Sequence, residues 1–372
     1  MLNIPETYEQ SRSQFCDHFN HLKTRWPAAR LASQAIPNEP DLTIDWISAD
    51  ALQNREKLFV LTTGEHGIEG YVGSAMLELF LNEYAPRLDP NTTGILFVHA
   101  INPWGMKYWK RCNPNNVDLN RNFITDADFA PYANSNPDYP RLASFLSPQK
   151  ALGAIALEKA RFFARTLENL VRFGPRRTRE AALTGQYIQP QGIYFGGQSL
   201  QAETKVLMDL YQSAFYGYAK IIHLDMHTGY GPRYQMTLVN SPLEKMNAAE
   251  TTLKYGTPRV AAANPDEFYT MQGDMLDWEY NLVKTESPST HFFAATCEFG
   301  TFGDSLLAGA RSLRITIFKN QLNQFGAHRT AVDWVEPEYR ELYRPSETAW
   351  FEKARLDACQ AFEGVLKAEG YF

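Results

Sequence analysis

The sequence predicts an α/β protein, a three-layer α/β/α sandwich with a mixed, mostly parallel central sheet. Short apolar runs at residues 58–62, 94–100, 221–226 and 292–297 have the length and composition of buried strands. Longer segments with helical periodicity alternate with these runs. Strand–helix alternation over such a length is typical of a sheet that is covered by helices on both faces.

The expected elements follow the chain in order. The first two are an amphipathic helix over 8–24 and a half-exposed strand over 42–48. The strand 58–62, a helix from Tyr71 to Tyr84 and the strand 94–100 come next. A Pro- and Asn-rich excursion at 124–150 leads to helices over 148–173 and 199–218. Strands at 221–226, 236–239 and 292–297 follow, then a helix after Gly303 and a last helix that the Ser346 hydroxyl would cap.

No internal repeat and no linker interrupts this pattern. We therefore expect residues 1–372 to form a single domain with an insertion at about 124–200. Polar residues 189–197, around Tyr194, are candidates for part of a cleft rim.

Composition excludes several classes of function. The chain has 372 residues, 44% of them hydrophobic, which is enough to build a large core. Its net charge of −6 does not suit a nucleic-acid-binding protein, which would carry an excess of basic residues. No run approaches the roughly 18 apolar residues of a membrane span, and the first residues lack the apolar stretch of a signal peptide. Four cysteines without paired spacing indicate reduced thiols. We expect a cytoplasmic protein without nucleic-acid or membrane partners.

A candidate metal site begins at His66 and Glu69, which follow the predicted strand 58–62. Imidazole nitrogen and carboxylate oxygen are typical ligands of a hydrolytic zinc site, and the carboxyl ends of strands are where open α/β sheets place their sites. His227 ends the strand 221–226 and enters a glycine-containing loop, so it is the candidate third ligand. The set predicts one Zn²⁺, although another divalent metal would also suit these ligands.

Glu298 emerges from the apolar strand 292–297, where a carboxylate is costly to bury without a partner or a purpose. It is either a salt-bridged residue at a strand end or the general base of a metal hydrolase. His99 and His223 lie inside apolar strands, and we interpret them as hydrogen-bonded core histidines.

Residues 111–123, with the sequence RCNPNNVDLNRNF, carry a family resemblance. They resemble, in register, the Arg-x-Asn-x-x-Gly-Val-Asp-Leu-Asn-Arg-Asn-Phe segment of the zinc carboxypeptidase superfamily. Only the glycine differs, and Asn116, which replaces it, also tolerates left-handed backbone. A looser match, Tyr269-x-x-x-Gly273-x-x-x-Asp277-Trp278, resembles the segment that carries the family's mobile, substrate-contacting tyrosine. The resemblance implies a funnelin-type α/β fold and a zinc carboxypeptidase-like catalytic domain.

The resemblance also implies a role for each matched residue. The metal ligands would be His66, Glu69 and His227, and Asp118 would accept a hydrogen bond from the second ring nitrogen of His66. Glu298 would be the general base, and Arg111 would stabilise the oxyanion. Asn120 and Arg121 would hold the free carboxylate of the substrate, and Tyr269 would close over it.

Two branches of the superfamily remain open. No arginine lies between His66 and Tyr71, and the His66-Gly67-x-Glu69 form is closer to the aspartoacylase and succinylglutamate desuccinylase branch, which cleaves N-acyl amino acids. The Tyr269 segment favours the carboxypeptidase branch, which is our preferred prediction. A non-catalytic, peptide-binding pseudo-hydrolase is a further alternative. The whole chain also resembles an uncharacterised bacterial group of carboxypeptidase-like proteins.

The expected substrate is a small peptide or an N-acyl amino acid. Leu276 lies two positions before Trp278, where the resemblance suggests contact with the terminal side chain of the substrate. An apolar residue there would disfavour a basic terminal residue, because a buried Lys or Arg would lack a counter-charge. We therefore expect a neutral or apolar terminal residue.

Overall fold

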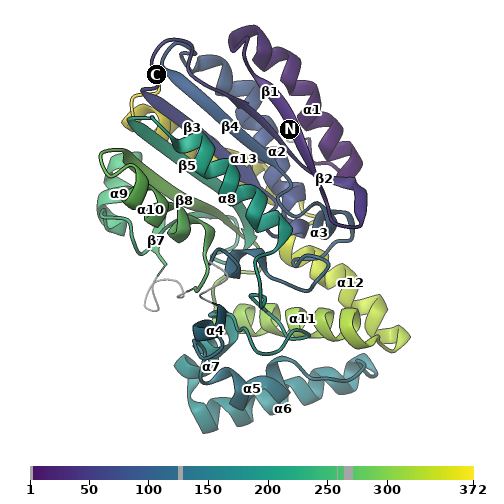
Figure 1. Cartoon of the computed structure of the whole chain (residues 1–372). Helices are drawn as coiled ribbons and strands as arrows, with labels where there is room; N and C mark the ends of the chain where they lie inside the picture. Colours follow the sequence, from purple (N-terminus) through teal and green to yellow (C-terminus); the bar gives the residue numbers. More distant parts are fainter. Residues whose placement is uncertain (1–2, 125–128, 258, 264–270) are drawn as a thin grey trace.

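A mixed eight-stranded sheet forms the centre of the protein, and its strand order is β1-β2-β4-β3-β5-β8-β6-β7 (Figure 1). The structure is a computed structural model and describes residues 3–124, 129–257, 259–263 and 271–372. The strands are β1 (Arg30–Ile36), β2 (Glu39–Ala49), β3 (Lys57–Thr63), β4 (Thr93–His99), β5 (Lys220–Gly229), β6 (Met236–Asn240), β7 (Val260–Ala262) and β8 (His291–Gly300). The central strands β4, β3, β5 and β8 are parallel neighbours, whereas β1/β2, β2/β4 and β8/β6 pair antiparallel.

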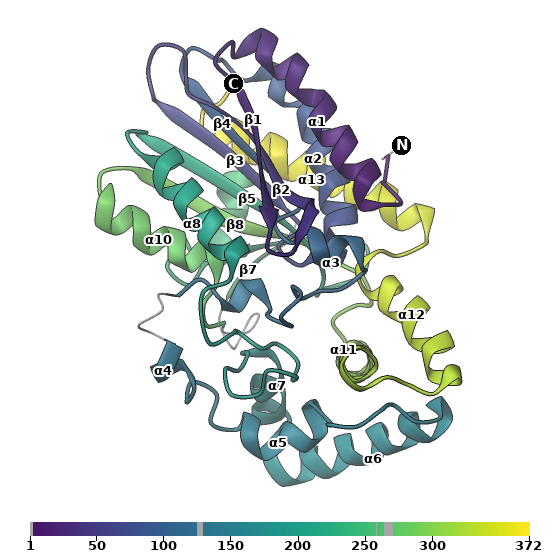
Figure 2. The ribbon, with the colours of Figure 1, turned by 45° about the vertical axis from the view of Figure 1, so that its right-hand side comes forward.

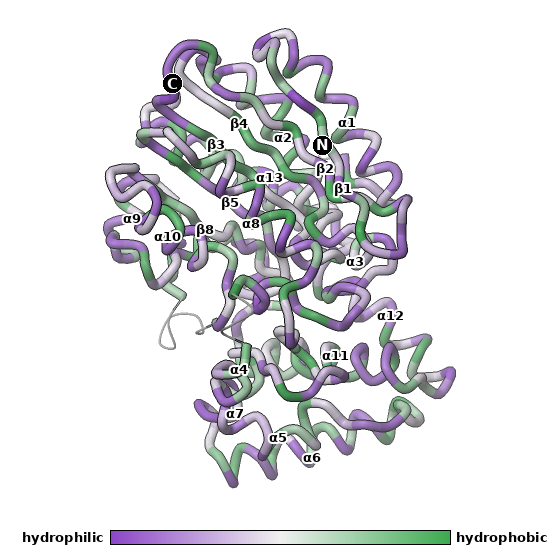
Figure 3. The backbone as a smooth tube through the Cα atoms, viewed as in Figure 1, coloured by the Kyte–Doolittle hydropathy of each residue, from purple (hydrophilic) through white to green (hydrophobic). Residues whose placement is uncertain are grey.

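Helices cover both faces of this sheet, and two cores result. One core joins the sheet to α1 (Tyr8–Arg25), α2 (Gly70–Glu83) and α13 (Thr348–Ala368); the other joins it to α8 (Ala202–Phe215) and α10 (Met275–Glu286). Successive residues of β3 point to opposite faces, so Phe59 and Leu61 enter the first core while Leu58 and Val60 enter the second. Along α1 at the edge of the molecule, hydrophobic and hydrophilic residues alternate (Figure 3). The predicted three-layer α/β/α fold is confirmed.

A second group of helices lies beyond the carboxyl ends of the central strands (Figures 1 and 2). It contains α4 (Phe129–Tyr132), α5 (Tyr139–Leu146), α6 (Ile155–Phe173) and α7 (Pro175–Leu183) from the predicted insertion, with α11 (Leu306–Phe325) and α12 (Arg329–Tyr343). Apart from α4, which packs in a small separate cluster with Tyr187, these helices share a core that includes Phe145, Phe162, Phe318 and Val335. The insertion therefore packs next to the edge of the sheet where the candidate site was expected.

The remaining helices are short, α3 (Pro103–Lys107) and α9 (Ala248–Tyr255), and 3-10 turns occur at η1 (Gly67–Glu69), η2 (Ala85–Arg87) and η3 (Leu119–Arg121). The Asn247 side chain and Glu250 form a reciprocal cap on α9. In the described part of the chain, no helix has the length and apolarity to cross a membrane.

Several sequence predictions need correction. Strands β1 and β7 were not predicted, because β1 is a largely exposed edge strand without apolar alternation and β7 has only three residues. Helix α12 was not predicted and contains Pro337. The last helix begins at Thr348 with Glu347 at its N-cap, and no side chain caps it. The predicted Ser346 cap is wrong; Ser346 instead donates its backbone N–H to Glu341.

Candidate metal centre

Three neighbouring parallel strands, β3, β5 and β8, deliver the candidate site residues. His66 follows β3 after a turn at Gly64, whose φ of 74° suits glycine, and Glu69 lies in η1 directly before α2. Gly67 between them packs so tightly that an added Cβ would lie 2.2 Å from the backbone of Gly105. His227 on β5 and Glu298 on β8 are paired residues of the parallel ladder. The sheet order thus brings together side chains that are far apart in the sequence.

The three predicted ligands face one another with compact geometry. His66 Nδ1 lies 3.0 Å from Glu69 Oε1, and His227 Nδ1 lies 3.1 Å from Glu69 Oε2. The two Nδ1 atoms are 3.1 Å apart. Ligand atoms about 2.0–2.1 Å from one zinc in a tetrahedron are separated by roughly 3.3 Å. The spacing of these side chains therefore fits a single zinc ion.

Each histidine is oriented by a second carboxylate on its other ring nitrogen. His66 Nε2 lies 3.0 Å from Asp118 Oδ1, which is the contact expected from the sequence. His227 Nε2 lies 2.5 Å from Asp225 Oδ2. Metal binding requires a proton on each Nε2, shared with its carboxylate, and a free lone pair on each Nδ1. The carboxylate partners favour this arrangement, in which both Nδ1 atoms face the common point beside Glu69.

Asp225 is itself part of a buried hydrogen-bond chain. Thr62 Oγ1 donates to Asp225 Oδ1 at 2.6 Å and contacts His223 Nε2 at 2.7 Å. His223 Nδ1 lies 2.8 Å from Glu279 Oε2. The interpretation of His223 as a hydrogen-bonded core histidine is confirmed; His99, which contacts Ser11, is also a buried core residue. The chain that ends at Glu279 holds Asp225 in place behind the candidate ligand His227.

Glu65 also lies in the cluster, since Glu65, His66 and His227 each offer a ligand atom within 4.8 Å of the others. We assign the carboxylate ligand to Glu69 for two reasons. Glu65 approaches the Nε2 of His227, at 3.5 Å, and Asp225 already occupies that nitrogen. Burial and the charge of Asp225 raise the pKa of Glu65 well above its ordinary value, which favours the neutral acid, a poor ligand. Burial alone would also raise the pKa of Glu69, but the two histidines outweigh it and lower that pKa.

Glu298 is 7% exposed and accepts a hydrogen bond from the Tyr230 backbone N–H at 2.9 Å. Burial, with the negative charge of Glu69, raises the pKa of Glu298 to about 7, although His227 and Arg111 act in the opposite direction. A carboxyl group with a pKa near neutral pH is suited to accept and return a proton.

Arg111 lies against the triad. Its Nη1 donates to Glu69 at 3.1 Å and its Nε donates to Asp118 at 3.0 Å, while Nη2 lies 2.6 Å from His66 Nε2. The hydroxyl of Tyr343, on α12, also contacts Arg111. This placement puts a fixed positive charge beside the candidate metal position.

Asn120 and Arg121 have structural partners as well as their predicted role. The Asn120 side chain accepts the backbone N–H of Met275 and so supports the start of α10. Arg121 is 1% exposed and donates to the carbonyls of Asn120, Leu183 and Thr184. A substrate carboxylate at Arg121 would compete with these carbonyls, two of which belong to the insertion.

The other two predicted substrate contacts are Tyr269 and Leu276. Tyr269 lies outside the described residues. Leu276 is 4% exposed and belongs to the core between α10 and the sheet, so it does not face the triad. The preference for a neutral or apolar terminal residue, which rested on Leu276, loses its structural basis.

Asp225 and Tyr194 lie beside the candidate site, and neither was singled out as a site residue from the sequence. Asp225 lies two positions before His227 on one strand, and the strand period of two would have placed both side chains on one face. Tyr194, in the segment considered for the rim, has a φ of 50° and its ring lies 5.3 Å from the Arg111 guanidinium and 5.9 Å from that of Arg121. Only the fold brings the insertion over both arginines.

Comparison with solved structures supports the fold. The crystal structure of thrombin activatable fibrinolysis inhibitor matches with a TM-score of 0.50 and 12% identity, over 97% of this chain and 75% of that chain. Carboxypeptidase A from Helicoverpa armigera matches with a TM-score of 0.45 and 12% identity, over 90% and 75% of the two chains. A putative succinylglutamate desuccinylase/aspartoacylase from Shewanella frigidimarina matches with a TM-score of 0.39 and 15% identity, over 80% and 72%.

No curated protein sequence matches this chain. Residues 5–356, nearly the whole chain, match the family model described as "Protein of unknown function (DUF2817)". The chain belongs to this family.

Proposed function

We propose that this protein is a zinc-dependent hydrolase that cleaves the amide bond next to a free carboxylate, as a metallocarboxypeptidase does. The convergence of His66, Glu69 and His227 within 3.1 Å of one another is the observation that carries the proposal. When bound there, a zinc ion supplies an acidified water and a Lewis acid for the amide carbonyl.

The chain's own residues would perform the remaining steps. Glu298 would take a proton from the attacking water and deliver it to the leaving nitrogen, in keeping with its raised pKa. Arg111 would donate to the carbonyl oxygen as negative charge develops on it. Asp118 and Asp225 would hold the two histidines in the required tautomer. Asn120 and Arg121 would receive the free carboxylate of the substrate.

Cleavage of N-acyl amino acids is the second candidate, and the insertion favours it. Residues 183–194 lie over Arg121 and Arg111, and the triad itself is buried. Such a covered site suits a short acyl group better than a long peptide. The pseudo-hydrolase reading is less favoured, because every expected ligand and base position holds a competent residue.

The test begins with the purified protein, stripped of metal by a chelator and reloaded with zinc. We expect one zinc per chain and zinc-dependent release of amino acid from a panel of dipeptides, tripeptides, N-acetyl and N-succinyl amino acids. Release from the N-acyl substrates alone would replace the first candidate with the second. Full activity of the stripped protein, or no release from any substrate by the zinc-loaded protein, would refute the proposal.

A further inference from the structure

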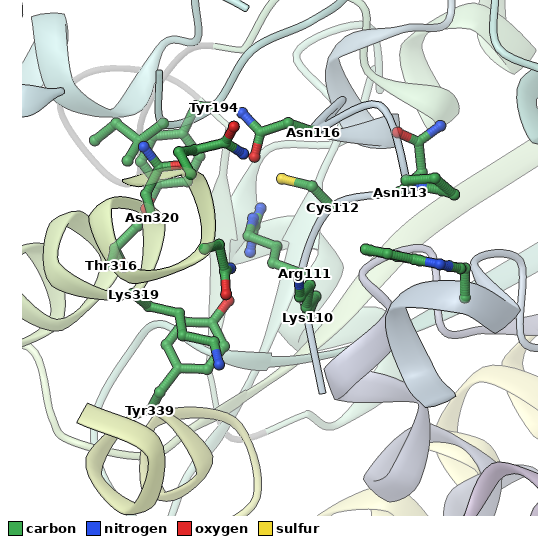
Figure 4. A pocket seen from close by; sticks show the side chains of 15 residues that line it. Lys110, Arg111, Cys112, Asn113, Asn116, Tyr194, Thr316, Lys319, Asn320 and Tyr339 are labelled. Carbon is green, nitrogen blue, oxygen red and sulfur yellow. The ribbon is translucent and has the colours of Figure 1, made fainter. Parts of the chain in front are cut away.

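A pocket of about 270 Å³ adjoins Arg111 and is not explained by the chemistry above. This volume is enough for a small acid or an amino-acid-sized group. Its walls come from the loop 110–116, from residues 193–194 and from helices α11 and α12 (Figure 4). The lining therefore combines the segment 110–116 with the insertion and with the second helical group.

The lining is cationic. Lys110, Arg111 and Lys319 all line the pocket, and among the described residues that line it none is acidic. The other polar side chains of the wall are uncharged, and they include Asn116, Asn320, Asn323 and Gln324. Aromatic faces are supplied by Trp104, Tyr194 and Tyr339.

The three cations are not equally compensated. Arg111 is paired with Glu69 and Asp118, and Lys319 is paired with Glu336 at 2.5 Å. Lys110 is half-buried, and its Nζ lies 4.9 Å from the centre of the Trp104 ring. Within the described part of the chain, no carboxylate oxygen lies within 4.0 Å of this Nζ. Burial and the charge of Lys319 lower the pKa of Lys110, although the more distant charge of Glu336 acts in the opposite direction. An anion in the pocket would offset the cost of this unpaired charge.

The pocket also has a defined position relative to the proposed reaction. Arg111 is shared, since its guanidinium contacts Glu69 and it forms part of the pocket wall. Asn120, Arg121 and residues 183–184 are not among the lining residues. A substrate with its carboxylate at Arg121 and its carbonyl oxygen at Arg111 would extend its acyl part away from Arg121. Among the described residues that this chemistry uses, Arg111 alone lines the pocket, so the acyl part would enter it past Arg111.

We infer that this pocket binds a carboxylate carried by the acyl part of the substrate, with Lys110 as its main charge partner. The inference rests on the proposed function and narrows the substrate class to amides whose acyl side is acidic, such as a glutamyl or a dicarboxylic acyl group. Lys110 is here a specificity-determining residue and takes no part in the bond-breaking step.

The experiment uses substrate pairs that differ by one charge, N-acetyl-Glu-Leu with N-acetyl-Gln-Leu and N-succinyl-Leu with N-succinamoyl-Leu. We expect the zinc-loaded protein to prefer the acidic member by about tenfold or more in kcat/KM, the range of a charge-assisted hydrogen bond. Lys110→Gln should remove most of this preference and leave the neutral substrates unchanged. The matched control is Lys205→Gln, because Lys205 is exposed on α8 and does not line the pocket. Equal rates within both pairs, or equal effects of the two variants, would overturn the inference.

A binding measurement separates this inference from the proposed function. Glutarate should raise the unfolding temperature of the wild-type protein and of Lys205→Gln, and it should raise that of Lys110→Gln much less. If glutarate binds in this way but the acidic substrates are not preferred, the pocket is a site for a free acid and the acyl assignment is wrong. If glutarate binds but no amide is cleaved, the proposed function fails while the anion site stands. If glutarate does not bind and no acidic preference appears, the pocket assignment fails.

Discussion

Replacement of Asp225 by Asn tests whether the buried hydrogen-bond chain tunes the metal centre. Asp225 is fully buried, and its two oxygens contact His227 Nε2 at 2.5 Å and Thr62 Oγ1 at 2.6 Å. An amide of the same shape keeps the packing but removes the negative charge that holds the Nε2 proton. Loss of such a partner typically weakens metal affinity by 10- to 100-fold, or about 1.4 to 2.8 kcal/mol.

The assay is a competition titration of zinc against a chromophoric chelator, with stoichiometry checked on the same samples. Asp45→Asn is the matched control, because Asp45, on β2, is also a buried acid but pairs with Arg12 of α1, away from the triad. We expect weaker zinc binding for Asp225→Asn and unchanged zinc binding for Asp45→Asn. An Asp225→Asn protein that is folded and binds zinc as tightly as wild type would refute the reasoning.

Three further predictions concern the same site. Glu298→Gln should lower kcat by about 10²- to 10⁴-fold while zinc stoichiometry is kept; near-wild-type turnover would exclude Glu298 as the base. Glu298 must be ionised to accept a proton, so kcat/KM should fall as the pH falls through the pKa of this group. Burial raises that pKa from 4.5 to about 7, and a bound cation would lower it. Activity that rises towards acid pH would contradict this prediction. Gly67→Ala should lower the unfolding temperature and the zinc content, because the added Cβ would lie 2.2 Å from the Gly105 backbone. The control Gly309→Ala has open space around its Cβ and should be neutral or stabilising by up to about 1 kcal/mol.

The parts of the fold that could be predicted are those where one residue pattern decides the structure. Strands β3, β4, β5 and β8 are nearly continuous apolar runs, because helices cover them on both faces. Edge strand β1 could not be predicted in this way, since most of its residues are exposed and its pairing with β2 supplies the missing stability. Propensity also misled at Ser346, because the N-cap position is held by Glu347 and no side chain caps the helix.

For the site, local order in the chain was enough to propose His66, Glu69 and His227, and the resemblance supplied Asp118. The contact between Asp118 and His66 spans 52 residues and has the expected geometry. Leu276 shows the opposite case: its position in the motif suggested substrate contact, but α10 turns that side chain into the core. A motif determines which residues are near each other in sequence, and the rotation of a helix determines which of them face a cleft.

By itself, the sequence determined the fold class, the residue types at the candidate metal centre and the strands that carry them, because hydrophobic periodicity and ligand chemistry are local properties. Only the tertiary structure decided that Asp225 stands behind His227, that Tyr194 of the insertion lies over Arg111, and that Lys110 and Lys319 share one cationic pocket. These relations depend on the order of strands in the sheet and on the packing of the insertion against α11 and α12, and no local pattern encodes them.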